Sequence, residues 1–262
     1  MRLRSMIAIA AIGLATTIGS ITSASTAKAG TVGVFGERFS LGVIDNFYDG
    51  LAGHSSSILG SITGGALSGI DLLWAVQPSN AYTGAELTAM QDFLGGGGRI
   101  AFMGEHGSFA PNENNRINAA LSAFGSTMSI INELVDIGVR TATVADGQIL
   151  NHPLTAGVNR YDYAAFAPLS MGENGIALML GEDDTSDIMM GFENIGGGSI
   201  FLITDQNVWD TARRADSDNE VLFENLLVGR TVSTVPLPAA GWMMIAGLAA
   251  LGFFRRRAGM RA

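Results

Sequence analysis

Glu105 and His106 are the residues whose types and spacing are best suited to chemistry, and they stand between two glycines in Gly104-Glu-His-Gly107. A carboxylate and an imidazole can act as general base and general acid when burial adjusts their pKa values and a substrate comes within hydrogen-bond reach. An apolar run that leads through a glycine-flanked polar pair into a helix has the order of a nucleophile elbow. Neighbouring residues at a strand end normally point in opposite directions. The pattern therefore also allows a structural role, in which the elbow hydrogen-bonds the next loop.

Other polar residues directly follow predicted strands. In a doubly wound sheet, ligands bind beyond the carboxyl ends of the strands. The candidate binding residues at these ends are Glu37, Gln77, Asn80 and Asp205. His152 precedes Pro153, a pair typical of a turn.

Two acidic clusters offer the oxygen ligands that Ca²⁺ prefers. One is Glu182-Asp183-Asp184 with Asp187, and the other is Asp216-x-Asp218-x-Glu220. Neither has the glycine and glutamate positions of an EF-hand loop. Asp218 also has a simpler candidate role as the cap of the following helix. The sequence leaves both alternatives open, with Asp216, Asp218 and Glu220 as candidate metal ligands and Ca²⁺ as the candidate cofactor.

The elements that must position these residues alternate in type along the first half of the chain. Short apolar runs predict strands at 31–35, 70–76 and 99–103, and helical periodicity or capping signals predict helices near 41–51, 84–94 and 114–124. Thr83 and Glu86 have capping-box spacing for the second helix, and Gly125 suits the end of the third. This order predicts a parallel sheet with helices on both faces.

The second half is richer in strands. Runs at 127–131, 141–144, 161–166, 176–180, 188–192 and 199–203 are short and apolar or alternating, and an amphipathic helix is predicted at 219–228. The glycine-rich segment 193–198 indicates a hairpin between the last two strands. We therefore predict an α/β fold of three layers, with extra strands in its second half.

The charge distribution restricts the partners. Seven of the 15 basic residues lie in the two terminal segments, so 8 basic and all 24 acidic residues lie between them and give that stretch a formal charge of −16. A nucleic-acid-binding protein needs a basic footprint, which this stretch lacks. The chain has no cysteine, which excludes thiol nucleophiles and thiolate metal sites.

The first 29 residues have the three parts of a secretory signal peptide. Arg2 and Arg4 precede the apolar stretch 7–18, and Ala27-Lys28-Ala29 provides a small-residue cleavage site. The alternative is an uncleaved anchor, for which the apolar run is short.

The C-terminal segment combines Val235-Pro236-Leu237-Pro238-Ala239, an apolar run at 240–254, and Arg255-Arg256-Arg257. Hydropathy alone allows an ordinary transmembrane anchor with its arginines on the cytoplasmic side. The full pattern resembles the PEP-CTERM sorting signal in its VPLPA variant. That resemblance implies a Gram-negative exported protein, recognised through residues 235–239 by a membrane-embedded exosortase at the inner membrane. Cleavage near the motif would then deliver the product to the cell surface or the exopolysaccharide matrix.

The stretch between these signals resembles the class I glutamine amidotransferase-like, flavodoxin-like superfamily, in particular the domains of gliding-motility and intraflagellar-transport auxiliary proteins. Residues 70–76 with 97–104, residues 151–158, and residues 197–205 with 218–225 carry the likeness. Amidotransferases place a catalytic cysteine at the elbow, where this chain has Glu105. The resemblance therefore implies the fold without the thiol chemistry.

These observations predict three parts: a signal peptide at 1–29, an amidotransferase-like domain at 30–230, and a linker with sorting signal and transmembrane helix at 231–262. The first functional hypothesis is an exported, exosortase-sorted surface or matrix protein whose domain is a non-catalytic binding or structural module, with extracellular polysaccharide as a candidate partner. The second is a secreted hydrolase that acts on a glycan or amide through Glu105 and His106. The third is a ligand-sensing module that keeps its membrane tail.

Overall fold

The computed structural model describes residues 30–36 and 41–228. The predicted signal peptide, Glu37, the sorting motif 235–239, the apolar run 240–254 and the arginines 255–257 lie outside these residues, as does the side chain of Asp216. Across the described part of the chain, every helix is too short or too polar to cross a bilayer.

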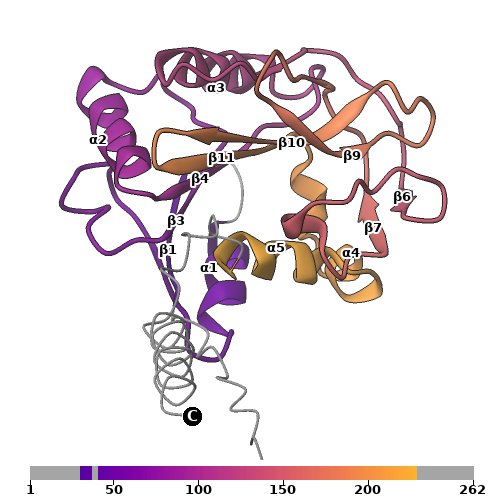
Figure 1. Ribbon diagram of the computed structural model, residues 1–262, viewed down its shortest axis with the longest axis horizontal. Helices are drawn as coiled ribbons and strands as arrows, with labels where there is room; N and C mark the ends of the chain where they lie inside the picture. The colour runs from indigo at the N-terminus through magenta and orange to yellow at the C-terminus, as the bar shows by residue number, and fades with distance from the viewer. Residues whose placement is uncertain (1–29, 37–40, 229–262) are drawn as a thin grey trace, which may run out of the picture.

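A seven-stranded sheet forms the centre of the structure (Figure 1). Its spatial order is β2 (Ser55–Ile58), β1 (Thr31–Gly36), β3 (Leu72–Val76), β4 (Arg99–Met103), β11 (Gly198–Ile203), β10 (Ile188–Ile195) and β9 (Ile176–Leu180). The first five strands in that order are parallel, whereas β10 and β9 are antiparallel to their neighbours. β3 and β4 are buried at every position, as expected for strands covered on both faces.

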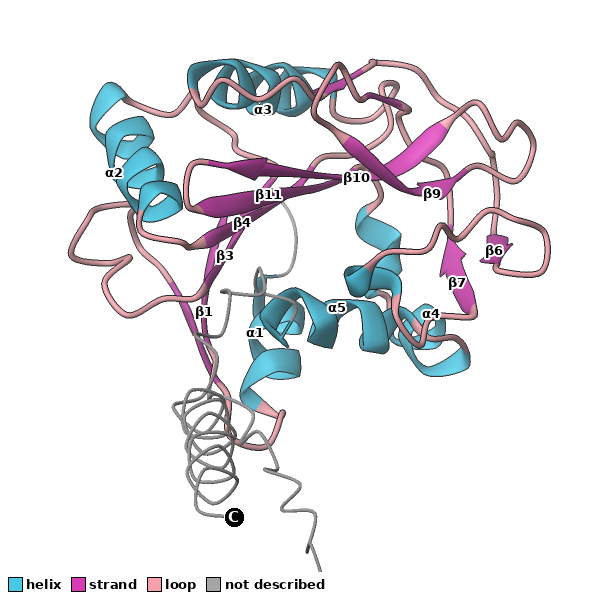
Figure 2. Cartoon of the chain, viewed as in Figure 1, coloured by secondary structure: helices cyan, strands magenta, loops and turns pink. Residues whose placement is uncertain are grey.

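Helices cover both faces of this sheet, which gives three layers (Figure 2). α2 (Gly84–Gly95) and α3 (Pro111–Ala123) pack on one face through residues such as Met90 and Leu121. α1 (Leu41–Asp49) and α5 (Asn219–Val228) pack on the other through residues such as Ile44 and Leu222. The predicted three-layer α/β arrangement is confirmed.

The face that carries α1 and α5 has an aromatic core. The Tyr48 hydroxyl donates to the carbonyl oxygen of Phe223 (3.0 Å) and accepts from Trp74 Nε1 (3.1 Å), so it joins α1, β3 and α5. The rings of Trp209 and Phe223 stack with their centroids 4.0 Å apart. These contacts attach α5 to α1 and to the sheet.

Smaller elements lie beside the main sheet. β5 (Ser129–Ile130) pairs with β8 (Leu169–Ser170), and β6 (Arg140–Thr143) pairs with β7 (Arg160–Tyr163). Two 3₁₀ turns, η1 (Pro153–Thr155) and η2 (Gln206–Trp209), and the short helix α4 (Thr211–Asp216) complete the described chain.

Most local signals in the sequence correspond to observed elements. The predicted capping box joins Thr83 and Glu86, and Gly125 follows α3 with a φ of 74°, the left-handed conformation expected for a C-terminal glycine. The predicted start of α3 at 114 is wrong, because Pro111 occupies the first turn and the helix begins there. The hairpin is confirmed, and it makes β10 antiparallel within the otherwise parallel centre of the sheet.

Candidate functional site

The carboxyl ends of β3, β4 and β11 lie side by side because Val76, Met103 and Ile203 are in register. The chain leaves these ends through Gln77, Gly104 and Thr204. Gln77 Nε2 donates to Gln206 Oε1 (3.0 Å) and to the carbonyl oxygen of Gly104 (3.4 Å). The ends of these three strands are therefore connected by hydrogen bonds of the Gln77 side chain.

Glu105 is buried at this edge, with 1% of its surface exposed. One carboxylate oxygen accepts from the backbone N–H of His106 (3.0 Å), and the other accepts from the backbone N–H of Gln206 (3.1 Å). Burial, with a smaller contribution from the charge of Asp205, raises the pKa of Glu105 to about 8. The side chain thus connects the elbow to the loop after β11 and is directed into the protein.

The elbow backbone is held by α3. Asn114 Oδ1 accepts from the N–H of Glu105 (3.0 Å), and Asn114 Nδ2 donates to the carbonyl oxygen of Glu105 (2.6 Å). The same Nδ2 donates to Asn132 Oδ1 (2.9 Å). A Cβ at Gly104 would lie 2.5 Å from Asn114 Oδ1, and one at Gly107 would lie 2.3 Å from the backbone of Asn132. The two glycines therefore permit close packing of the elbow against its neighbours.

The His106 side chain is half-buried and does not hydrogen-bond Glu105. Its Nε2 lies 3.8 Å from Glu105 Oε1, too far for a hydrogen bond. Its Nδ1 instead lies 2.9 Å from Ser108 Oγ. Desolvation lowers the pKa of His106. The Glu105 and His106 side chains are therefore not hydrogen-bonded to each other.

Gln77 and Asp205, two predicted binding residues, are fully buried. Gln77 has a φ of 34°, a positive value that is uncommon for residues other than glycine. Such values indicate local backbone strain, which is often found at functional sites or tight turns. The Asp205 carboxylate accepts from the backbone N–H groups of Ala164 (2.6 Å) and Asn207 (2.7 Å). Burial raises the pKa of Asp205 to about 6. Both side chains hydrogen-bond neighbouring loops, and Gln77 Oε1 has no hydrogen-bond partner among the described residues.

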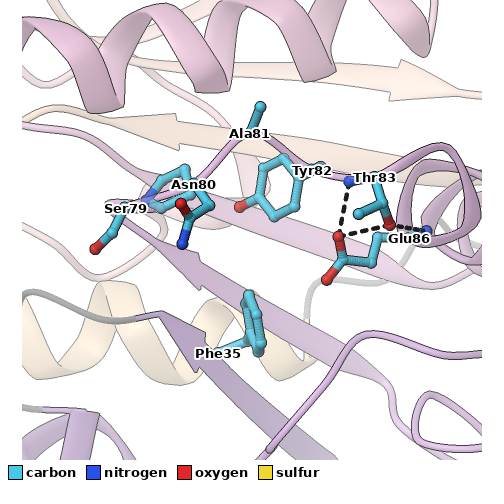
Figure 3. Close-up of a pocket in the computed structure, with 8 residues that line it drawn as sticks. Phe35, Ser79, Asn80, Ala81, Tyr82, Thr83 and Glu86 are labelled. Carbon is cyan, nitrogen blue, oxygen red and sulfur yellow. Dashed lines mark hydrogen bonds between the residues drawn. The ribbon is translucent and has the colours of Figure 1, made fainter.

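Asn80 is exposed and lines a pocket of about 210 Å³ beside the ends of β1 and β3 (Figure 3). The other lining residues come from the end of β1, the loop after β3 and the first turn of α2: Phe35, Pro78, Ser79, Ala81, Tyr82, Thr83 and Glu86. Arg116 of α3 holds the loop after β3, because its Nη1 donates to the carbonyl oxygen of Pro78 (2.9 Å). Of the predicted binding residues that the structure describes, Asn80 is the one that lines this pocket.

No protein-family model matches the chain, and no curated protein matches it. Solved structures resemble it at low sequence identity. The mmIFT52 N-terminal domain is 16% identical with a TM-score of 0.63, and the match covers 79% of this chain and 100% of that one. The cytoplasmic protein STM1381 from Salmonella typhimurium LT2 is 12% identical with a TM-score of 0.59, over 76% of this chain and 99% of that one. A GMP synthase-like protein from Thermoplasma acidophilum is 10% identical with a TM-score of 0.50, over 76% and 92%. The fold is amidotransferase-like.

Members of both acidic clusters take part in contacts within the protein. Asp218 Oδ2 accepts from the backbone N–H groups of Asn159 (2.8 Å) and Arg160 (3.1 Å). Glu220 lies 3.5 Å from Arg214, and Asp183 lies 3.2 Å from Arg140. Among the described residues, no group of three or more acidic or histidine side chains is arranged to hold a metal ion. Asp218 directly precedes α5, and its carbonyl oxygen accepts from the N–H of Leu222 (3.3 Å), whereas its carboxylate hydrogen-bonds the start of β7.

His152 has the predicted turn role, since its Nδ1 accepts from the N–H of Leu154 (3.2 Å) at the start of η1. Sequence reasoning missed two residues of the site, Asn114 and Tyr82. Asn114 gives no local signal, because its role depends on how α3 packs against the elbow backbone at Glu105. Tyr82 could have been noticed as an aromatic residue directly before the Thr83 helix cap.

Proposed function

We propose that this chain is an exported, exosortase-sorted protein of the cell surface or exopolysaccharide matrix, with an amidotransferase-like domain that acts as a non-catalytic binding module. The observation that carries the non-catalytic role is the environment of Glu105. The position where amidotransferases have their nucleophile holds a buried carboxylate, and two backbone N–H groups occupy its oxygens.

Electrostatics disfavours one form of the alternative hydrolase function, in which the Glu105 carboxylate and the His106 imidazole act as a triad-like pair. A triad-like arrangement needs an ionised carboxylate to orient and stabilise an imidazolium. Here burial raises the pKa of Glu105 to about 8 and lowers the pKa of His106, so both groups favour their neutral forms at pH 7. The contact between Ser108 and His106 joins residues two apart in one tight turn, as local polar contacts commonly do.

Export and sorting are supported by the sequence. The signal-peptide pattern of residues 1–29 and the tail with the 235–239 motif form a consistent pair at the two ends of one chain. The strongly acidic composition between them suits a protein that must stay soluble and dispersed outside the cell.

Processing of the full-length chain in its native host tests the proposal. Mass spectrometry of cell fractions is expected to find a mature N-terminus at Gly30 and a C-terminus close to residues 235–239. In a strain without the exosortase, the chain should remain uncut in the membrane fraction. A tail that keeps Trp242 and Phe254 in the wild-type host would instead support a tethered sensor.

Enzymatic assays separately test the proposal that the domain is not catalytic. Hydrolysis of a glycan or amide substrate that disappears in Glu105→Gln and His106→Ala would contradict it, whatever the sorting result. Equal background rates in the wild type and both variants are expected.

A further inference from the structure

The pocket at Asn80 lies at the carboxyl ends of β1 and β3, where the strand order of the sheet changes direction. β2 lies on one side of β1 and β3 lies on the other, so the strand order changes direction at β1. α1, which follows β1, and α2, which follows β3, pack on opposite faces of the sheet. In open α/β sheets, the crevice beyond the carboxyl ends of such a strand pair is the place where ligands bind.

The pocket has an apolar wall with a polar end. Phe35 and Tyr82 provide aromatic surfaces, and in Figure 3 the hydroxyl end of Tyr82 points toward Asn80. The Tyr82 hydroxyl oxygen is buried, yet it has no hydrogen-bond partner among the described residues. A buried tyrosine hydroxyl normally finds a partner, and leaving it without one costs free energy. Because this oxygen has almost no surface accessible to water, a ligand hydroxyl group would supply that partner once the side chains that cover it shift on binding.

The charges of the pocket argue against an anion. Among the described residues, the lining includes no lysine, arginine or histidine, and it includes the carboxylate of Glu86. The positive end of α2, which could otherwise attract an anion, is already occupied by this carboxylate. Glu86 Oε2 accepts from the N–H (2.7 Å) and the hydroxyl (2.8 Å) of Thr83, as the dashed lines in Figure 3 show.

The same bonds argue against an organic cation as the intended ligand. The Glu86 carboxylate is engaged by two donors and lies in the first turn of a helix, where the helix dipole compensates negative charge. What remains on the lining is a neutral mixture of donors and acceptors: the amide of Asn80 and the hydroxyls of Ser79 and Tyr82. Such groups match a ligand that has an apolar ring face and several hydroxyl groups around the edge of the ring.

We propose that the pocket formed by Phe35, Ser79, Asn80, Tyr82 and Glu86 binds one uncharged sugar residue of a glycan. The volume of about 210 Å³ is below the roughly 300–1,000 Å³ of pockets for drug-sized ligands, and it suits a single ring. One ring face stacks on the aromatic wall, and its hydroxyl groups bond to Tyr82, Asn80 and Ser79. This inference deepens the proposed role as a binding module and rests on it.

Binding is tested with the purified full-length protein in a detergent without sugar headgroups. Saturation-transfer NMR titrations use the methyl glycosides of glucose, galactose and mannose, with glucuronate as the anionic probe and glucosamine as the cationic probe. At least one neutral glycoside is expected to bind saturably in the millimolar range, and more tightly than both charged probes.

Tyr82→Phe is the informative variant, because it keeps the aromatic ring and removes the hydroxyl. It should weaken binding about fivefold or more while leaving the unfolding midpoint unchanged or higher. Tyr161→Phe is the matched control, since the Tyr161 hydroxyl is also buried without a partner among the described residues but lies outside this pocket. It should leave the affinity unchanged. Asn80→Ala, at an exposed position, should weaken binding without affecting stability.

Three results would overturn the inference: no binding by any neutral glycoside, tighter binding of glucosamine or glucuronate, or neutral-sugar binding that Tyr82→Phe leaves unchanged. These results are independent of the processing experiment. A failure of sugar binding with correct sorting rejects the pocket assignment, whereas an uncut, unsorted chain that still binds sugar rejects the proposed sorting.

Discussion

Asn114 holds the backbone of Glu105 from both sides. Its Oδ1 accepts from the Glu105 N–H at 3.0 Å, and its Nδ2 donates to the Glu105 carbonyl oxygen at 2.6 Å. One side-chain amide from α3 therefore replaces the strand partner that both backbone groups lose beyond the end of β4. This pairing orients the elbow so that the carboxylate of Glu105 enters the protein.

Asn114→Asp should destabilise the protein by about 2–4 kcal/mol, measured by chemical denaturation near pH 7. The substitution removes the donor to the Glu105 carbonyl oxygen and adds a buried negative charge. Asn112→Asp is the control, because Asn112 is exposed in the first turn of the same helix, where negative charge is favourable. Equal stability of the two variants would contradict the role assigned to Asn114.

Glu105→Gln tests the consequence of burying the carboxyl group. The pKa of Glu105 is raised to about 8 from an ordinary value of 4.5, so the folded state holds the proton more tightly than the unfolded state. The wild type should lose stability as the pH rises from 4.5 to 8, by at most about 5 kcal/mol from this group. The variant should lack this loss and be the more stable protein at pH 9.

The measurement is the free energy of unfolding of both proteins at pH 4, 6 and 9. Asp92→Asn, at an exposed position on α2, should change stability by no more than about 0.5 kcal/mol at each pH. A wild-type protein that gains stability relative to Glu105→Gln between pH 6 and 9 would contradict the assignment.

The glycines of the elbow provide a steric test. Gly107→Ala should destabilise the protein by about 1–3 kcal/mol, because its Cβ would lie 2.3 Å from the backbone of Asn132 and the backbone must move. Gly95→Ala is the matched control: nothing lies within 4 Å of its added Cβ at the end of α2. That substitution should be neutral or slightly stabilising. The comparison uses thermal unfolding midpoints.

The sequence predicted elements whose signals are local and missed interactions that depend on distant residues. The buried run 99–103 and the helix 219–228 were recognisable from apolar pattern alone, because burial determines both. β2 was missed, since Ser55–Ile58 is an exposed, serine-rich edge strand with no apolar alternation. Glu105 was identified as a special residue, but its burial could not be foreseen. It depends on Asn114 from α3 and on the backbone N–H of Gln206, 101 residues away in the chain.

Asp218→Ala distinguishes a structural carboxylate from a calcium ligand. Asp218 Oδ2 accepts two backbone N–H groups at the start of β7, and removing this half-buried acceptor leaves those donors unpaired. The variant should lose about 1–3 kcal/mol of stability with or without added Ca²⁺. The wild-type unfolding midpoint should not change with Ca²⁺, because this carboxylate already has its partners and the neighbouring Glu220 lies beside Arg214.

Thermal scans of the wild type, Asp218→Ala and the control Glu173→Gln, each with and without millimolar Ca²⁺, make the comparison. Glu173 is exposed, so its substitution should leave the midpoint unchanged in both conditions. A Ca²⁺-dependent rise of the midpoint in the wild type and in the control, absent from Asp218→Ala, would restore the calcium site. Asp218 binds the backbone through one oxygen, so Asp218→Asn, which keeps a single acceptor oxygen, should lose less stability than Asp218→Ala.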